Sequence, residues 1–338
     1  MATIKEIAAK LGLSPSTVSI VLSRHGDERK ISAKTQQRVL VAAQEMSYQP
    51  SIAARTLRRS AGEGDSPVTI AVFWADDFRA GMMVRFLRGL RQGIAKCNQP
   101  VHLSLFSYAN GQLCNQAALR QQTECHAAIV CNASTEDMNF LENSELPVPV
   151  VLYNRYSSKY PTVNVDDFLM GQLAADALAD SECRTVSVLT SHPAYPGMSQ
   201  RTEGFLATAQ ARGMQIIKLD ECENSLSGGF HALFSRPAKE LPEGLFCGSD
   251  NIALGALRAL WEKKIRIPQQ IKIVAIGNGD RDAEEYAIPS LSVVYLPMEE
   301  MALNCLQLTL DVLSGKQPGE KSLLLPVKFI ARESCGPH

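Results

Sequence analysis

Several signatures of membrane and secreted proteins are missing from this chain of 338 residues. No apolar run approaches the roughly 18 residues that a membrane-spanning helix needs. The first 15 residues carry Lys5, Glu6 and Lys10, where a secretory signal would have an uninterrupted apolar core. We therefore expect a cytoplasmic protein with no membrane partner.

Cysteine pairs and catalytic motifs are also missing. The nine cysteines are odd in number, scattered and never spaced as Cys-x-x-Cys, so we expect buried reduced thiols and no disulfide framework or metal site. The chain has no P-loop, no G-x-G-x-x-G after a first strand, no H-E-x-x-H and no G-x-S-x-G. Its histidines are isolated. These absences predict no catalytic residues, no cofactor and no enzymatic activity.

Charge is distributed very unevenly along the chain. The first 60 residues carry a formal charge of +6, whereas the remaining residues carry −7, although the whole chain has a net charge of only −1. A cationic head on an anionic body is typical of a protein that binds a polyanion with one end only.

The cationic head has the pattern of three short helices. Apolar residues at helical spacing end at Gly12, Ser14 is a suitable N-cap, and Pro15 suits a first helical position. These features predict a helix-turn-helix. A third helix should begin near Ser32 and close a small core with Val39, Leu40, Ala43 and Met46.

A basic segment follows the head. Residues 51–59 contain good helix formers but no apolar stripe, so a helix there would be marginal alone and would need a partner surface. Arg55, Arg58 and Arg59 favour phosphate as that partner, and residues 60–67 have the composition of a flexible linker. We expect a helix-turn-helix domain at 1–49, a hinge helix and linker at 50–67, and an effector-binding and dimerisation domain at 68–338.

The head resembles the lactose/galactose repressor (LacI/GalR) family. The matching segments are Thr3-Ile4-Lys5-Glu6-Ile7-Ala8, Gly12-Leu13-Ser14, Ser16-Thr17-Val18-Ser19, Val21-Leu22, Ile31-Ser32, Tyr48-Gln49-Pro50 and Arg55-Thr56-Leu57. The resemblance implies that the second helix enters the major groove of double-stranded DNA and that paired hinge helices insert Leu57 into the minor groove. It assigns DNA contacts to Thr3, Ser14, Pro15, Ser16, Thr17, Ser19, Ile20, Arg24, Ala53, Leu57 and Arg58.

One of these positions departs from the family. Relatives commonly have Arg or His where this chain has Ile20. Isoleucine donates no hydrogen bond to guanine and offers only apolar contact, for example to a thymine methyl group.

The body alternates apolar strands with amphipathic helices, which predicts an α/β fold of two doubly wound parallel-sheet lobes. The expected strands are 68–74, 102–106, 127–131 and 148–153, then 186–190, 215–219, 245–247, 271–276 and 291–294. The expected helices are 82–96, 113–124 and 135–143, then 204–211, 229–235 and 252–264.

The family resemblance continues through this body. It is carried by Val163-Asn164-Val165-Asp166 with Gly171, by Arg201-x-x-Gly204-Phe205, by Ser249-Asp250 with Ala253-Leu254-Gly255, and by Ile288-Pro289-x-Leu291. It implies the type I periplasmic-binding-protein fold, with crossovers near Asp166, Leu296 and Leu325. The N-lobe would then comprise about 68–165 and 296–324, and the C-lobe about 166–295 and 325–338.

Ligands of open α/β sheets bind beyond the carboxyl ends of the strands. The residues expected there for effector binding are Trp74, Asp77, Phe78, Arg79, Tyr153, Asn154, Asp166, Arg201, Asp250 and Asn278, with Asp76 and Arg155 beside them. Carboxylates and arginines can grip vicinal hydroxyls while aromatic rings cover a sugar face, so the mixture suits a sugar or sugar derivative. Arg201 matches the family's ligand arginine. Relatives usually have an acidic residue at the position of Asn278, so a different or anionic effector is an open alternative.

These features predict a sequence-specific DNA-binding regulator, expected to be a repressor, whose operator affinity is controlled by a ligand between the lobes. Lobe closure would change the spacing of two hinge segments in a homodimer. A dimer is favoured over a tetramer because no heptad segment follows Arg332. Two alternatives use the same α/β body: a cytoplasmic solute-binding protein, against which the head argues, and a sugar-related enzyme, against which the missing motifs argue.

Overall fold

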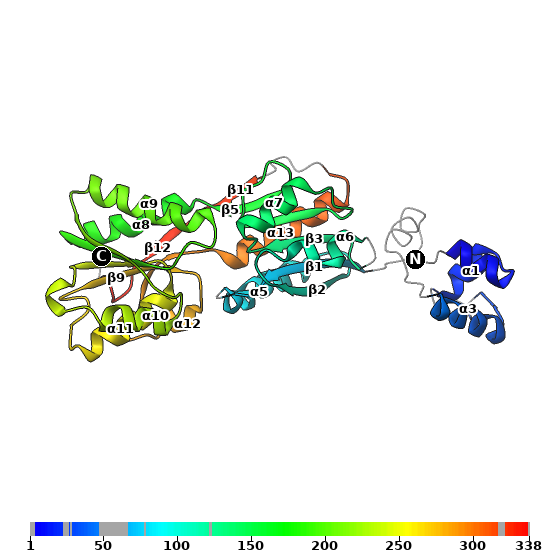
Figure 1. Cartoon of the computed structure of the whole chain (residues 1–338), viewed down its shortest axis with the longest axis horizontal. Coiled ribbons are helices and arrows are strands. Elements are labelled where there is room, and N and C mark those ends of the chain that lie inside the picture. The colour runs from blue at the N-terminus through cyan, green and yellow to red at the C-terminus, as the bar shows by residue number, and fades with distance from the viewer. Residues whose placement is uncertain are drawn as a thin grey trace.

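The computed structural model describes residues 4–22, 27, 29–46, 67–77, 79–121, 124–316 and 322–336. Its described part comprises a three-helix head and a body of two α/β lobes (Figure 1). The predicted hinge helix and most of the linker, residues 50–66, lie outside the described residues.

The head contains α1 (Ile4–Leu11), α2 (Pro15–Leu22) and α3 (Ala33–Glu45), as the sequence predicts. Gly12 ends α1 with φ of +65°, a conformation that side chains with a Cβ rarely adopt. The Ser14 hydroxyl accepts a hydrogen bond from the Thr17 amide at 3.0 Å and caps α2. The prediction for Leu40 was wrong, because its side chain is 48% exposed; the core consists of Ile7, Ala8, Val18, Val21, Val39, Ala42 and Ala43.

The N-lobe is a six-stranded sheet with the order β11-β5-β4-β3-β1-β2. Side chains of β1, which lies between β3 and the edge strand β2, alternate between two apolar layers: Val72 belongs to the cluster that contains Phe86 of α5, whereas Phe73 belongs to the cluster that contains Leu141 of α7. The strands are β1 (Val68–Ala75), β2 (Val101–Tyr108), β3 (Ala127–Cys131), β4 (Val150–Tyr153), β5 (Thr162–Val165) and β11 (Ser322–Leu325). The helices are α5 (Met83–Ile94) and α13 (Met298–Leu313) on one face, and α6 (Ala117–Arg120) and α7 (Thr135–Asn143) on the other.

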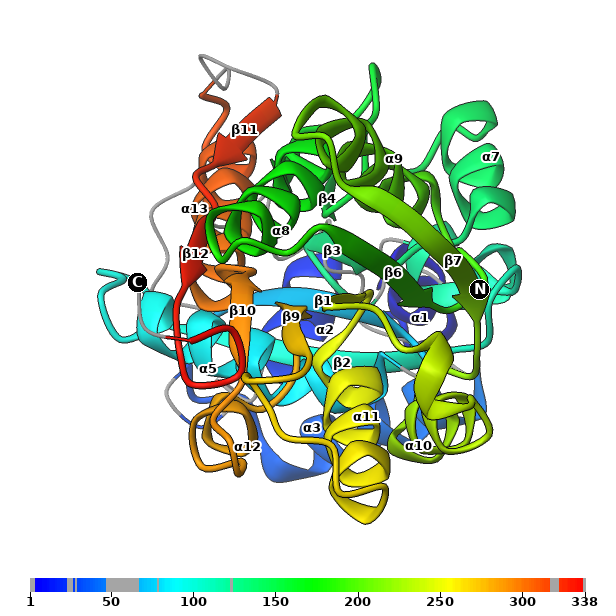
Figure 2. The same ribbon diagram turned by 90° about the vertical axis from the view of Figure 1, so that its left-hand side faces the viewer.

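The C-lobe repeats this plan with the strand order β12-β10-β9-β8-β6-β7. Figure 2 shows its sheet between one helix layer formed by α8 and α9 and another that includes α10 and α11. The strands are β6 (Thr185–Thr190), β7 (Gln215–Glu221), β8 (Gly244–Cys247), β9 (Lys272–Gly277), β10 (Ser292–Tyr295) and β12 (Lys328–Ile330). The helices are α8 (Asp167–Asp180), α9 (Pro196–Ala211), α10 (Leu226–Phe234), α11 (Asp250–Glu262) and α12 (Arg281–Glu285).

Several details differ from the sequence predictions, which included none of β5, β11, β12, α8, α12 and α13. The helix expected at 113–124 is interrupted: a 3₁₀ turn at Leu113–Asn115 precedes the four residues of α6. The Asp137 carboxylate accepts hydrogen bonds from the Gly111 and Leu113 amides, both at 3.1 Å, and so holds a turn in place of a helix. The last strand, β12, pairs antiparallel with β10, so the C-lobe sheet is not wholly parallel.

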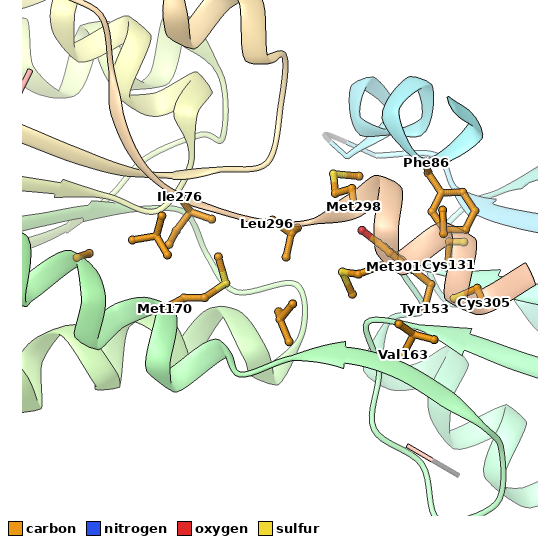
Figure 3. Close-up of a cluster of buried hydrophobic side chains, with 14 of the residues drawn as sticks. Phe86, Cys131, Tyr153, Val163, Met170, Ile276, Leu296, Met298, Met301 and Cys305 are labelled. Carbon is orange, nitrogen blue, oxygen red and sulfur yellow. The ribbon is translucent and has the colours of Figure 1, made fainter. Parts of the chain in front are cut away.

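The chain passes between the two sheets three times, after β5, after β10 and after β11. One buried apolar cluster is continuous across these crossovers. Figure 3 shows Leu296 on the crossover after β10, with Met170 and Ile276 on its C-lobe side and Met298 and Met301 on its N-lobe side. The lobes are therefore joined by a packed apolar hinge.

All nine cysteines are free thiols. Six are buried, as expected, but Cys97, Cys114 and Cys222 are partly exposed. Within the described ranges, no helix combines the length and the hydropathy needed to cross a bilayer.

Candidate functional site

A cavity lies between the two lobes, where the carboxyl ends of the strands of both sheets meet. About 380 Å³ there is free of protein atoms, open solvent included, but in this closed arrangement the cavity itself is narrow, with a volume of only about 20 Å³. Its walls come from loops and helix ends that follow β1, β3 and β4 in the N-lobe and β6 to β9 in the C-lobe. The lining residues are Arg79, Met82, Asn132, Tyr153, Asn154, Tyr195, Met198, Arg201, Asn224, Gly248, Asn278 and Leu296.

Arg201 reaches the cavity from α9 because α9 packs closely on α8. A Cβ atom on Gly171 would lie 2.0 Å from the Arg201 carbonyl oxygen, so only glycine permits this approach. The Arg201 Nε donates to Asp167 Oδ1 at 2.7 Å, and its terminal nitrogen Nη2 donates to Tyr195 Oη at 2.9 Å. Burial alone would lower the pKa of Arg201, but Asp167 and Tyr195 hold it above its usual value. Arg201 is therefore positioned as a fixed cation.

Tyr195 connects the lobes. Its hydroxyl accepts a hydrogen bond from Asn154 Nδ2 of the N-lobe at 3.3 Å, and its ring lies 3.9 Å from the guanidinium carbon of Arg155. Asn154 has φ of +53°, which turns the chain directly after β4. Because these contacts join the two lobes across the cavity, the structure represents a closed arrangement.

Arg79 closes the N-lobe side of the cavity. Its guanidinium forms a bidentate ion pair with Asp77, and Asn110 Nδ2 donates to the same carboxylate at 2.9 Å. Burial alone would raise the pKa of Asp77, but the hydrogen bonds and charge of Arg79 keep it below its usual value. The carboxylate of Asp77 is therefore engaged by Arg79.

Arg85 binds the crossover between the lobes beside the cavity. Arg85 of α5 binds both carboxylate oxygens of Glu299, at 3.0 and 2.8 Å, and donates to the Leu296 carbonyl at 3.0 Å. The same side chain lies 3.4 Å from the carbonyl oxygen of Gly279 in the C-lobe. Arg85 thus links α5, α13 and the loop after β9, which fixes the relative position of the lobes in this state.

The structure brings five of the ten predicted effector residues to the cavity: Arg79, Tyr153, Asn154, Arg201 and Asn278. Trp74 does not line it, because β1 extends to Ala75 and the pleat directs Trp74 into the core, where it packs on Phe86 with ring centroids 5.3 Å apart. Phe78 lies outside the described residues.

Three carboxylates predicted to contact effector are engaged elsewhere. Asp77 pairs with Arg79, and Asp166 caps α8 by accepting from the Leu169 amide at 2.9 Å. Asp250 is 1% exposed and accepts from the Gly279 amide at 2.9 Å. None of the three lines the cavity.

Sequence reasoning missed the other lining residues, which are Met82, Asn132, Tyr195, Met198, Asn224, Gly248 and Leu296. Asn132 directly follows the predicted strand 127–131, so the rule that identified Asn154 would have included it. Asn224 lies only three residues beyond β7. Tyr195 precedes Pro196, the first residue of α9, but the sequence carried no signal that its ring would cross to the other lobe.

Two buried carboxyl groups behind the cavity predict a pH dependence of stability. Burial raises the pKa of Asp250 to about 6, and burial together with Asp250 raises the pKa of Glu284 to about 7. The facing cations are Arg85 and Arg332; Arg332 lies 3.4 Å from Glu284 Oε2. Since the folded state holds these protons more tightly than the unfolded state, stability should fall as pH rises from about 4 to 8.

Glu284→Gln should remove part of this dependence. At pH 8 the variant should be more stable than the wild type by an amount on the order of 1–3 kcal/mol, because no charge is then buried at position 284. Melting temperatures measured from pH 5 to 8 test the prediction, with the exposed Glu262→Gln as control. Parallel curves for Glu284→Gln and the wild type would contradict it.

The outward face of α2 is the second candidate site. Pro15 and Ser16 are exposed, and Thr17, Ser19 and Ile20 are partly exposed, whereas Val18 and Val21 are buried in the head core. Ser14 caps the helix at the same end. The other predicted DNA contacts, Thr3, Arg24, Ala53, Leu57 and Arg58, lie outside the described residues.

Comparisons with known families match both parts of the chain. A family model described as bacterial regulatory proteins of the lacI family matches residues 3–51, and one described as a periplasmic binding protein-like domain matches residues 175–335. The HTH-type transcriptional repressor PurR of Pasteurella multocida is 24% identical over 350 residues, covering 99% of this chain and 98% of that protein.

Solved structures agree. A LacI family transcription regulator from Clostridium acetobutylicum has a TM-score of 0.75 and 33% identity, covering 79% of this chain and 100% of that chain. The lac repressor dimer bound to operator has a TM-score of 0.70 at 20% identity and covers 99% of both chains. A LacI family transcriptional regulator from Enterococcus faecium with bound ribose has a TM-score of 0.66 at 23% identity, covering 80% of this chain and 99% of that chain.

The curated relatives of this chain are transcriptional repressors and not enzymes. The helix-turn-helix head, the two-lobed body and the 33% identity to a family member lead to one conclusion: this chain belongs to the LacI family of transcriptional regulators.

Proposed function

We propose that the protein is a repressor that binds a specific operator through α2. Its affinity for the operator falls or rises when a small ligand occupies the cavity between the lobes. The observation that carries the proposal is the presence in one chain of a head with an exposed α2 face and a body whose cavity is lined from both lobes. A ligand that contacts both lobes favours the closed arrangement over an open one. The difference in ligand affinity between the open and closed arrangements couples ligand binding to DNA binding.

The DNA contact rests on the residue types along α2. Pro15, Ser16 and Ile20 lie off the buried face and can approach base edges, while Ser14 and Thr17 at the helix N-terminus suit phosphate contacts. The lac repressor is bound to operator in its solved structure. By analogy, α2 would lie in the major groove.

The ligand is proposed to be a sugar or sugar derivative. The cavity offers four asparagines, two arginines and the faces of Tyr153 and Tyr195, a set that donates and accepts hydrogen bonds in several directions around a polyhydroxylated ring. The Enterococcus faecium regulator binds ribose, and the regulator CelR binds cellobiose. Both proteins have this fold.

A second copy of the chain is proposed as its partner. The three most exposed large apolar side chains among the described residues of the C-lobe are Trp261 at 65%, Tyr286 at 77% and Ile288 at 92%. Trp261 and Ile288 line one groove beside Leu257 and Pro289. The lac repressor is a dimer in its solved structure, and an isologous interface would pair this face with itself.

Selection of operator from a random duplex pool with the full chain tests the proposal. We expect one enriched sequence with two-fold symmetry, because a dimer presents two copies of α2. Its affinity should then change when a sugar from a broad panel is added. A pool that shows no enrichment at moderate salt would contradict sequence-specific binding, and an operator affinity that no cavity ligand alters would contradict the control mechanism.

Ile20 supplies a sharper prediction about the docking of α2. An isoleucine cannot form the bidentate pair with guanine that an arginine forms, and such a pair discriminates by about 1–3 kcal/mol. Ile20→Arg should therefore shift preference at a single base pair by about tenfold or more toward guanine. Selection with both proteins at one salt concentration measures this shift.

The other positions of the site should change little. Lys34→Arg, a conservative change in the first turn of α3, serves as a control that should select the wild-type sequence. If Ile20→Arg also selects the wild-type sequence, Ile20 does not face the bases.

A further inference from the structure

Three arginines converge on one tyrosine ring in the cavity. The guanidinium carbons of Arg155, Arg201 and Arg79 lie 3.9, 5.9 and 6.0 Å from the centroid of the Tyr195 ring. We call these three residues the arginine cluster. Tyr195 and Arg201 belong to the C-lobe, whereas Arg79 and Arg155 belong to the N-lobe, so the cluster forms only when the lobes are close together.

The cluster has more cations than carboxylates. Arg79 is paired with Asp77, and Arg201 is paired with Asp167. No carboxylate of the described residues lies within ion-pair distance of Arg155. One positive charge at the junction of the lobes is therefore left without a counter-charge.

Arg155 is held in place and yet incompletely satisfied. It is 4% exposed, and its Nε and one terminal nitrogen donate to the carbonyls of Ala133 and Asn154, each at 2.5 Å. The second terminal nitrogen is buried and has no hydrogen-bond partner in the described part of the chain. Burial, together with the positive charge of Arg79, lowers the pKa of Arg155 to about 10. A buried guanidinium without a carboxylate partner is energetically unfavourable. Binding of an anion would relieve this, so Arg155 is a candidate anion-binding residue.

Two groups of the cavity wall are also mainly donors. Asn132 Nδ2 and Tyr153 Oη are buried, line the cavity and also lack partners among the described residues. An amide nitrogen is a donor only, and a phenol can donate. Among the described residues that line the cavity, none is acidic. The open hydrogen-bonding capacity is thus mainly that of donors around a positive charge.

We infer that the effector carries an anionic group, a carboxylate or a phosphate, which binds the free terminal nitrogen of Arg155 while the rest of the molecule contacts Arg201 and the asparagines of the cavity. Arg155 does not itself line the cavity in this closed arrangement, but Asn154 and Tyr195, which contact it, do. This inference rests on the proposed function and narrows its ligand class. A planar guanidinium edge matches the two oxygens of a carboxylate or phosphate.

Lobe opening gives the anion access. Tyr195 covers Arg155 from the opposite lobe, so separation of the lobes removes the ring and uncovers the guanidinium. When the lobes close on the anion, Arg201 and Tyr195 approach it from the C-lobe. The anion neutralises the cluster only in the closed state, and so it favours closure.

Thermal melting of the full chain tests the inference with three scaffold-matched series: neutral hexoses, the corresponding hexuronates, and hexose 6-phosphates. Ionic strength is kept constant with sodium chloride. We expect members of one anionic series to raise the melting temperature and the matched neutral hexose to raise it less. The carboxylate and phosphate series show which anion is bound.

The decisive comparison is between variants. Arg155→Gln keeps a hydrogen-bond donor but removes the charge, and it should weaken binding of the anionic ligand about 10-fold to 100-fold. Arg155→Lys keeps the charge but loses the planar edge, and it should retain part of the response. Arg212→Gln also removes one positive charge, from an exposed ion pair with Asp176 and Asp180, and it should respond like the wild type. If Arg155→Gln does not fold, Arg155→Lys is compared with Arg212→Gln. A smaller ligand-induced rise in melting temperature in Arg155→Lys would support the inference, and an equal rise would contradict it.

Two results would overturn the inference. In the first, a neutral hexose stabilises the wild type and Arg155→Gln equally and alters operator affinity. The proposed function would then hold, but the inference that the effector is anionic would be wrong. Alternatively, no anion in the panel could stabilise the wild type more than Arg155→Gln. Failure of the full chain to select an operator would contradict the proposed function separately, whatever the melting curves show.

Discussion

Arg201→Met is expected to destabilise the protein by about 3–5 kcal/mol and to abolish its response to effector. The variant leaves Asp167, which is 2% exposed, as a buried carboxylate without its cation, and it leaves Tyr195 Oη without its 2.9 Å donor. Removing one partner of a buried ion pair is far more harmful than removing both. Thermal or chemical unfolding, with ligand titration of the folded fraction, measures both effects.

A double variant separates stability from ligand binding. Asp167→Asn combined with Arg201→Met removes both charges and should recover much of the lost stability, yet its ligand response should remain absent because the cavity still lacks the arginine. An exposed pair offers a control: Arg258→Met, which breaks the pair with Glu262, should cost less than about 1 kcal/mol. If Arg201→Met were as stable as the control, the ion pair would not be important for folding. If the double variant responded normally to ligand, Arg201 would have a structural role only.

Ile288→Asp is expected to convert a dimer into a monomer and to weaken operator binding by about 100-fold or more. Ile288 is 92% exposed beside the groove that contains Trp261, so the change should not disturb the folded monomer. It would replace an apolar contact of the proposed interface by a carboxylate that must lose its hydration when the dimer forms, a cost that Lys264 and Arg266 of the same groove would offset only in part. Loss of the second head removes the gain that comes from binding two half-sites at once.

Sedimentation and operator titration of the same samples test this prediction. Leu226→Asp alters another large apolar side chain of the C-lobe, 56% exposed on α10, and should leave both the dimer and the operator affinity unchanged. A dimeric Ile288→Asp variant would place the interface elsewhere. A monomeric variant with unchanged affinity would mean that one head suffices for the operator.

The local sequence determined the elements of this protein. Gly12, Ser14 and Pro15 predicted the turn between α1 and α2, because each residue has a backbone or capping preference that acts within a few positions. Apolar runs predicted β1 to β4 and β6 to β10 for the same reason, but not β5, β11 and β12. The rule that ligands bind beyond the carboxyl ends of strands then placed Asn154 and Asn278 at the cavity without knowledge of any contact.

The same local reasoning failed where neighbours in space decide. Trp74 looked like a residue following a strand, but the strand continues to Ala75 and the alternation of side chains sends Trp74 into the core. Asp166 and Asp250 looked like ligand carboxylates, but backbone amides of Leu169 and Gly279 engage them. Strand ends and partner choice depend on packing, which a pattern of residue types does not contain.

The chemistry of the cavity was decided by the tertiary structure alone. The sequence placed Arg155 shortly after a predicted strand and Arg201 in a segment that resembles the family, but it carried no information that both would lie against Tyr195 from opposite lobes. It also could not show that two of three arginines would find carboxylates while Arg155 would not. This imbalance depends on contacts between residues distant in sequence, such as Arg201 with Asp167 within the C-lobe and Arg155 with Tyr195 across the lobes. The contact of Arg155 with Tyr195 exists only when the two lobes close on each other.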